Sequence, residues 1–214
     1  MRRKAAIVAM ALGCILIIGA AGLMLYNQWD DNRAAQAASE VAEVLSETIG
    51  ERTQAKASEL PSVTPKVIPI LPTQEEPEEI PEMPVESVDG IDYIGVLEIP
   101  ALELSLPVIE SWSYSKLRKA PCRFSGNVYA DNMVIMAHNY KRHFGKLQSL
   151  ISGDVVKFVD VEGTEFFYEV ALIETVNPNG SDLAKDAQYD MTLFTCTYNG
   201  KARVALRCVR AESD

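Results

Sequence analysis

The feature that most restricts the fold is a run of 22 residues without a charged side chain, Ala5 to Tyr26. As an α-helix this run is about 33 Å long, which is enough to cross the hydrocarbon core of a bilayer. Three basic residues precede it, and Asp30 and Asp31 follow it. Because basic residues stay in the cytoplasm, we expect residues 1–4 to be cytoplasmic, residues 5–26 to be a transmembrane anchor, and the remainder to be extracellular.

The alternative interpretation of this run is a signal peptide that is cleaved after translocation. A sequence resembling a cleavage site occurs at Ala35-Gln36-Ala37, but it lies well beyond the apolar run. The run is also longer than the apolar core of a usual signal peptide. We therefore predict an uncleaved, single-pass anchor in the cell membrane.

Two segments of different composition follow the anchor. Residues 27–58 are rich in Ala, Glu and Gln, with larger apolar residues at helical spacing, so they form either a helical stalk or a marginal helix with little fixed structure. Residues 59–88 contain seven of the eleven prolines, interleaved with glutamates. This composition favours extended polyproline II structure. We predict a Pro/Glu-rich linker that holds the following domain away from the membrane.

Residues 89–214 contain short apolar runs separated by turn signals, which indicates a mainly β domain. Only two helical pieces, 114–120 and 144–151, fit between these runs. A domain of this size with seven or eight strands predicts a closed β-barrel or a β-sandwich. The runs that we predict to be strands are Tyr93–Ile99, Leu104–Ile109, Met133–Ala137, Val155–Val161, Glu165–Ile173, Met191–Thr197 and Ala202–Val209.

Charge and ligand counts exclude two classes of function. The net charge of −10 argues against a general nucleic-acid binder, because phosphate binding requires a basic surface. Four cysteines without CxxC spacing and only two histidines argue against a zinc site. The acidic stretches Asp160–Glu165 and Asp182–Asp190 contain no regular calcium-binding loop, so we predict solvated loops and no cofactor.

One cysteine is a candidate nucleophile. Three of the four cysteines lie outside the predicted anchor, so at least one of them has no partner within the chain. Cys122 and Cys208 lie among ordinary strand residues, and whether they form a disulfide is not decided by the sequence. Cys196 instead ends a predicted strand beside the turn Thr197-Tyr198-Asn199-Gly200, a position that can face a groove.

A nucleophilic cysteine needs a base and an oxyanion donor. A thiol has a pKa of about 8.5, so a nearby cation or base is required for reactivity at neutral pH. His138 ends another predicted strand, and two strand ends can bring it to Cys196. Arg203 lies in the strand after Cys196, where hairpin geometry can return it to the thiol and to a developing oxyanion.

The segment TLFTC, Thr192 to Cys196, resembles the signature of the sortases, the membrane-anchored cysteine transpeptidases of bacterial cell surfaces. The resemblance covers about residues 91 to 211. The chain shows neither the Asp-Pro-aromatic lid nor the C-terminal membrane helix of many pilin-building members, so the subclass stays open. The other matching segments are Ile99-Pro100, Leu106-Pro107-Val108, Met136-Ala137-His138-Asn139-Tyr140, His143-Phe144-Gly145 with Leu147, and Gly153-Asp154 with Val156, Phe158 and Asp160.

The resemblance implies a sortase-like barrel and a role for each matching residue. Cys196 is expected to attack an LPXTG-like sorting signal of a secreted protein, and His138 to transfer protons to and from the amines. Arg203 is expected to hold the substrate and stabilise the oxyanion, with the backbone N–H of Thr197 as a second donor. Thr195 is expected to shape the site.

The same resemblance implies that the acceptor is an amine of a cell-wall precursor or a pilin subunit. His143 is expected to be a surface or helix-cap residue. The alternatives are a cysteine peptidase that mainly hydrolyses its substrate and an inert, membrane-tethered binding or scaffold domain.

Overall fold

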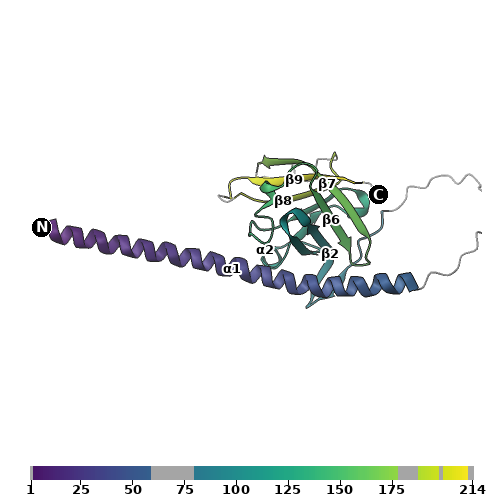
Figure 1. Ribbon diagram of the computed structural model, residues 1–214, viewed down its shortest axis with the longest axis horizontal. Coiled ribbons are helices and arrows are strands. Elements are labelled where there is room, and N and C mark those ends of the chain that lie inside the picture. The colour runs from purple at the N-terminus through teal and green to yellow at the C-terminus, as the bar shows by residue number, and fades with distance from the viewer. Residues whose placement is uncertain (1, 59–79, 178–187, 198–199, 212–214) are drawn as a thin grey trace, which may run out of the picture.

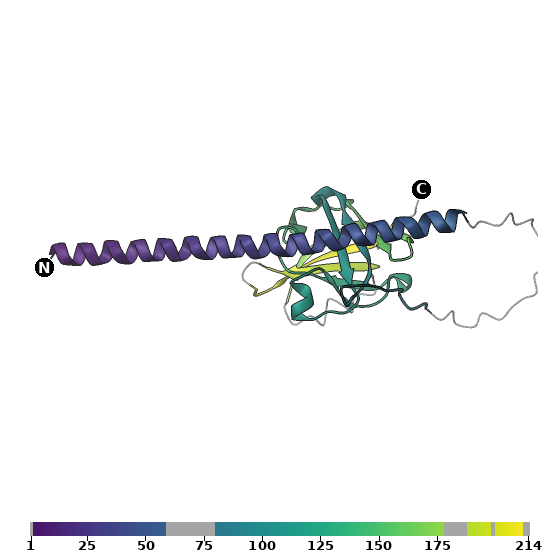
Figure 2. The same cartoon turned by 90° about the horizontal axis from the view of Figure 1, so that it is seen from below.

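A long helix and a β-barrel make up the described part of the chain (Figure 1). The structure is a computed structural model that describes residues 2–58, 80–177, 188–197 and 200–211. Helix α1 (Arg2–Ser58) is continuous over 57 residues, so the predicted anchor and the segment after it belong to one helix. Figures 1 and 2 show its first half projecting away from the barrel and its second half lying along the barrel wall.

The strands form one sheet in the order β1-β2-β3-β4-β5-β8-β9-β7-β6 within the described residues, and a pairing of β2 with β6 closes it. Strands β2 to β9 therefore make a closed eight-stranded barrel, and β1 is an added edge strand. The prediction of a mainly β, closed barrel with seven or eight strands is confirmed. The strands are β1 (Glu86–Val88), β2 (Ile91–Ile99), β3 (Leu104–Ile109), β4 (Cys122–Ser125), β5 (Met133–Met136), β6 (Val155–Asp160), β7 (Glu165–Val176), β8 (Met191–Cys196) and β9 (Arg203–Arg210).

Two strands were not predicted, and both are short. β4 has four residues and lies between Pro121 and Gly126, so its apolar pattern is too brief to be recognised. β1 occupies the end of the segment predicted as linker and pairs with β2. The turn between them, Asp89-Gly90, has positive φ at both residues, as a tight hairpin requires.

The helices within the barrel domain are shorter than predicted. α2 (Tyr114–Leu117) begins with a hydrogen bond from the Lys116 N–H to the Ser113 hydroxyl. The second predicted helix, 144–151, contains only the 3₁₀ turn η3 (Leu147–Ser149), and the N–H groups of Phe144 and Gly145 donate to carbonyls of the preceding loop. Two further 3₁₀ turns are η1 (Pro100–Leu102) and η2 (Val128–Ala130).

The side of α1 that faces the barrel is buried. Leu45 has no exposed surface and packs with Ile49 in a cluster that includes Tyr93, Val96 and Ile109 of the barrel wall. Burial of a leucine side chain contributes about 1.5–3 kcal/mol. Four alanines, Ala34, Ala35, Ala38 and Ala42, are also buried and allow the helix to lie close to the barrel.

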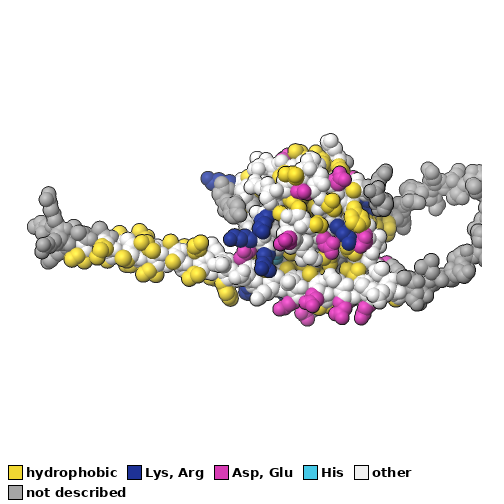
Figure 3. Space-filling model, viewed as in Figure 1, with side chains coloured by type: hydrophobic (Ala, Val, Ile, Leu, Met, Phe, Trp, Pro, Cys, Tyr) yellow, Lys and Arg dark blue, Asp and Glu magenta, His cyan; other side chains and the backbone are white. Residues whose placement is uncertain are grey.

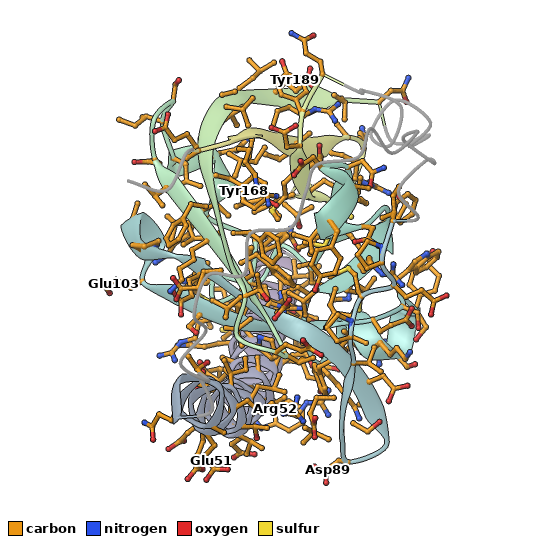
Figure 4. All side chains as sticks on the ribbon, turned by 90° about the vertical axis from the view of Figure 1, so that its right-hand side faces the viewer. Glu51, Arg52, Asp89, Glu103, Tyr168 and Tyr189 are labelled. Carbon is orange, nitrogen blue, oxygen red and sulfur yellow. The ribbon has the colours of Figure 1, made fainter. Side chains whose placement is uncertain are left out.

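Polar contacts fix the far end of the same helix face. Arg52 donates to the Val161 carbonyl at 2.9 Å and forms an ion pair with Glu86 of β1 at 2.5 Å. Figure 4 shows α1 end-on, with Arg52 toward the hairpin that ends at Asp89 and Glu51 pointing away.

The predicted spacer function of the linker is not tested by the described residues and stays a prediction. The barrel packs directly on the part of α1 that follows the apolar run, because the alanine face and Leu45 bury surface against β2 and β3. The linker residues 59–79 lie outside the described residues. Among those described, α1 is long and apolar enough to cross a membrane, and its large apolar side chains from Met10 to Trp29 are exposed (Figure 3).

Candidate active site

The ends of three neighbouring strands bring the predicted site residues into one row. β5 and β8 are parallel neighbours with Met136 beside Phe194, and the Ala137 N–H donates to the Phe194 carbonyl at 3.2 Å. His138 lies two residues beyond Met136 and Cys196 two residues beyond Phe194, so the two occupy equivalent positions at the ends of neighbouring strands. On the other side of β8, Cys196 lies directly opposite Arg203 of β9. Adjacent strands are about 4.8 Å apart, so the three residues occupy consecutive positions at one edge of the barrel wall.

Cys196 is half-buried and faces a cavity. All four cysteines are free, so Cys196 carries a thiol. The cavity has a volume of about 300 Å³. It is lined by Asn139, Phe144, Gly145, Gln148, Thr195, Cys196, Thr197 and Val204.

Thr195 ties the nucleophile strand to the histidine strand. Its side chain is 3% exposed, and its hydroxyl donates to the Ala137 carbonyl at 2.8 Å. Ala137 immediately precedes His138, and Thr195 immediately precedes Cys196. This buried hydrogen bond therefore fixes the two strand ends relative to each other.

Thr197 does not have the geometry expected of an oxyanion donor. Its N–H donates to the Ala202 carbonyl at 3.0 Å, within the connection between β8 and β9. Its hydroxyl is within hydrogen-bond distance of the Ala202 N–H and carbonyl. The expected second oxyanion donor is thus already committed to the hairpin. Residues 198 and 199 of that turn lie outside the described residues.

Arg203 is half-buried at the start of β9. Its Nη1 donates to the Ala202 carbonyl at 3.2 Å and to the Gly200 carbonyl at 3.5 Å. Among the residues described, no partner is present for its Nε and Nη2 groups. The guanidinium is therefore held by one nitrogen while its other N–H groups remain able to bind a substrate oxygen.

His138 is half-buried, and its pKa is affected by burial and by two charged neighbours. Burial lowers the pKa of the imidazole below its usual value, and the Arg118 guanidinium lowers it further, whereas the Asp30 carboxylate acts in the opposite direction. The ring contacts Tyr140, with 5.0 Å between centroids. A lowered pKa leaves the imidazole mainly neutral at pH 7, which is the form that acts as a base.

A family model described as the sortase domain matches residues 97–211, more than half of the chain. This chain belongs to the sortase family. All five predicted site residues of this sortase lie within the matched range, whereas α1 lies outside it. The family prediction made from TLFTC and its companion motifs is confirmed.

Known sortases resemble this sortase in sequence and fold. Sortase A of Bacillus anthracis is 29% identical over 116 residues, which are 51% of this chain and 55% of that protein, so the chain spans about half the length of this relative. Sortase C1 from Streptococcus suis has a TM-score of 0.50 and 26% identity over 57% of this chain and 74% of that chain. The Clostridium perfringens Sortase D5 transpeptidase has a TM-score of 0.52 and 23% identity over 59% and 83%, and it supports the fold alone.

The second histidine of this sortase is not at the surface, contrary to expectation. His143 is completely buried, and in the described part of the chain neither ring nitrogen has a hydrogen-bond partner. The backbone of Ala34 on α1 lies close to it. Burial, together with the neighbouring His138, lowers the pKa of His143 to about 4. The sequence contains no sign of this burial because the covering surface comes from α1.

Cys122 and Cys208 are free thiols in this sortase, so the structure contains no disulfide between them. Cys122 packs in the cluster beneath α1, and Cys208 packs in the main barrel core. Burial raises the pKa of each thiol to about 12. Both buried side chains therefore have a structural role.

The acidic turn at residues 160–165 is held by protein hydrogen bonds. Asp160 is buried and accepts from the Tyr129 hydroxyl at 2.6 Å and from the N–H groups of Glu162 and Thr164 at 2.9 and 2.8 Å. Within the described ranges, no group of three or more possible metal ligands occurs. Most of the second acidic stretch, residues 182–187, lies outside those ranges, so the expectation of no cofactor stays a prediction.

A second buried apolar cluster lies close to Cys196 in the sequence of β8 and was not predicted. Val134, Phe194 and Ala205 form a cluster that is separate from the barrel core, with Phe124, Met136 and Val176 packed against it. Phe194 is two residues before Cys196, so both side chains lie on the same face of β8. The alternation along β8 was visible in the sequence, but which neighbours share this face depends on the strand order.

Proposed function

We propose that this sortase is a membrane-anchored cysteine transpeptidase that cleaves an LPXTG-like sorting signal of a secreted protein and transfers the acyl group to an amine. The observation that carries the proposal is that Cys196 lies opposite Arg203 at the end of β8, while His138 follows the end of the neighbouring strand β5. A thiol between an imidazole and a guanidinium is a suitable arrangement for acyl transfer.

In the first step the Cys196 sulfur attacks the carbonyl carbon of the scissile peptide bond. A carbon–sulfur bond forms and the carbon–nitrogen bond breaks, while His138, which has first taken the proton of the Cys196 thiol, gives that proton to the departing amine. The N–H groups of Arg203 without a protein partner stabilise the oxyanion, because they present fixed positive charge where negative charge develops.

In the second step an acceptor amine attacks the thioester. His138 takes the proton of the amine, a new amide bond forms, and the Cys196 sulfur leaves as thiolate. The acceptor is an amine of a cell-wall precursor or a pilin subunit.

The proposed topology has residues 1–4 in the cytoplasm, residues 5–26 in the membrane and the barrel on the extracellular side. The exposed apolar side chains of the first half of α1 support a membrane span. The basic residues before this run support the cytoplasmic assignment of the N-terminus.

The test uses the full chain in detergent, because α1 packs on the barrel. It is incubated with a panel of LPXTG-like peptides with and without an added amine, and mass spectrometry follows adducts on Cys196. Amine-dependent transfer that is lost in Cys196→Ala and His138→Ala supports the proposal. An adduct that is only hydrolysed favours a cysteine peptidase, and an unmodified, free Cys196 with every peptide favours a scaffold domain.

A further inference from the structure

The loop that follows His138 is bound to the first residues of α1 beyond the apolar run. The Tyr140 hydroxyl donates to the Asp30 carboxylate at 2.7 Å, and the Lys141 N–H donates to Asp31 at 3.0 Å. Asp30 is four residues beyond Tyr26, which is about 6 Å along the helix axis. The proposed active site thus lies beside the part of α1 that directly follows the apolar segment.

The Tyr140 ring lies between the two histidine rings. Its centroid is 5.0 Å from that of His138 and 5.4 Å from that of His143. The loop is closed by hydrogen bonds from the Phe144 N–H to the His138 carbonyl and from the Gly145 N–H to the Tyr140 carbonyl, at 3.2 and 2.9 Å. A displacement of the Tyr140 ring therefore changes the packing of the His138 imidazole directly.

Packing fixes the helix against this loop independently of the hydrogen bonds. Ala34, Ala35 and Ala38 are 3%, 6% and 2% exposed, and the buried His143 lies near the Ala34 backbone. Because alanine side chains are small and rigid, the distance between α1 and the loop has little freedom. Asp30 is therefore presented to Tyr140 in a defined position.

The hydrogen bond holds over the whole physiological range of pH. Burial and the bond to Asp30 raise the pKa of Tyr140 to about 12, so its hydroxyl remains a donor. Among the described residues, the charged and titratable groups that act on or contact His138 are Asp30 from α1, Arg118 from the segment after α2, and Tyr140 and His143 from its own loop.

We propose that Asp30 is a positioning residue for His138: its carboxylate holds the Tyr140 hydroxyl, and the Tyr140 ring holds the imidazole in place beside Cys196. The inference rests on the proposed function, in which His138 transfers the protons. It makes the membrane helix a part of the active site and not only a tether. A barrel separated from α1 lacks this support.

The experiment compares full-length variants in the same detergent. Asp30→Asn weakens the acceptor and removes its charge, Tyr140→Phe removes the donor, and the double variant removes both. Glu40→Gln is the matched control, because Glu40 is exposed on the same helix and the change in charge is identical. The readouts are kcat and KM for peptide cleavage and the pKa of His138 by NMR. Because the chain has two histidines, the NMR signal of His138 is assigned in a His143→Phe variant, in which His138 is the remaining histidine.

We expect Asp30→Asn and Tyr140→Phe each to lower kcat about tenfold with KM unchanged, since a small displacement of a catalytic group costs rate and not binding. The double variant is expected to be no slower than either single variant, because both remove one interaction. The pKa of His138 falls in Asp30→Asn, where the carboxylate charge is lost, and changes less in Tyr140→Phe.

Two outcomes overturn the inference. One is a kcat for both single variants that equals that of Glu40→Gln. The other is additive losses in the double variant together with an unchanged pKa of His138 in Asp30→Asn. If the wild-type chain cleaves no peptide, the proposed function fails, and the NMR titration still decides whether Asp30 acts on His138.

Discussion

Cys196 and Arg203 lie directly opposite each other across the β8–β9 ladder. Directly opposed residues of antiparallel strands have Cβ atoms about 4.5–5.5 Å apart and side chains on the same face of the sheet. The side chains of Cys196 and Arg203 therefore share one face of the sheet, with the Arg203 Nη1 bonded to the carbonyls of Gly200 and Ala202 in the adjoining turn.

Replacing Arg203 is expected to reduce the chemical step more than binding. Arg203→Ala should lower kcat by about 100-fold, because an oxyanion donor is lost. Arg203→Lys should recover only part of the lost kcat, because lysine lacks the planar set of N–H donors of the guanidinium. Lys119→Ala, at an exposed basic residue, serves as the control. Steady-state kinetics with a fluorogenic peptide measures the effect, and an Arg203→Ala variant as fast as the control contradicts it.

Thiol labelling is expected to distinguish the three cysteines of the barrel. Cys122 and Cys208 have no exposed surface and pKa values of about 12, whereas Cys196 faces a cavity. In a Cys14→Ser chain, iodoacetamide should label Cys196 alone in the native state and all three thiols after denaturation. Peptide mass mapping without reduction gives the result. A Cys122–Cys208 disulfide in unreduced protein would contradict the structure.

The buried face of α1 is expected to stabilise the barrel. Leu45→Ala should lower the free energy of unfolding by about 2–5 kcal/mol, because it leaves a cavity between α1, β2 and β3. The neighbouring Val44 is 46% exposed, so Val44→Ala should change the free energy of unfolding by about 0.5 kcal/mol or less. Thermal unfolding of both full-length variants tests this pair. Equal stabilities would show that α1 does not pack on the barrel as described.

His143 is expected to make the fold sensitive to acid. Its pKa is about 4 in the folded state and about 6.5 when unfolded, so below about pH 6.5 the unfolded chain binds a proton that the folded chain does not. The effect of His143 on the free energy of unfolding is therefore constant above about pH 6.5. Between pH 6.5 and pH 4 this effect lowers the free energy of unfolding by about 3 kcal/mol. His143→Phe should remove this dependence and should not reduce stability at pH 7. Unfolding measured from pH 7 to pH 4 checks it, and an equally acid-sensitive variant contradicts it.

The turn at residues 160–165 is expected to be independent of calcium. Because the Asp160 carboxylate accepts three protein hydrogen bonds, EDTA should leave the melting temperature unchanged. Asp160→Ala should lower stability by about 3 kcal/mol, since it leaves buried donors without a partner, whereas the exposed Glu169→Ala should have little effect. Thermal unfolding with EDTA and with added calcium decides the point. Calcium-dependent stabilisation that is lost in Asp160→Ala would indicate a metal site.

Local patterns predicted much of the barrel, and the misses have physical causes. The apolar runs of β6 and β7 predicted both strands, because strand periodicity is a local property of the sequence. β4 was missed because four residues carry too little periodicity. His143 was assigned to the surface because its exposure depends on a helix more than 100 residues earlier in the chain, which no local pattern reports.

By itself, the sequence determined the uncharged helix near the N-terminus, the strands of the barrel and the family, because apolar length, period-two alternation and motif spacing are properties of short segments. Only the tertiary structure decided which distant segments meet. Asp30 and Tyr140 are 110 residues apart in the chain and share a hydrogen bond. That contact depends on an alanine face too weakly apolar to predict docking, and on a barrel surface that exists only once the strands have paired.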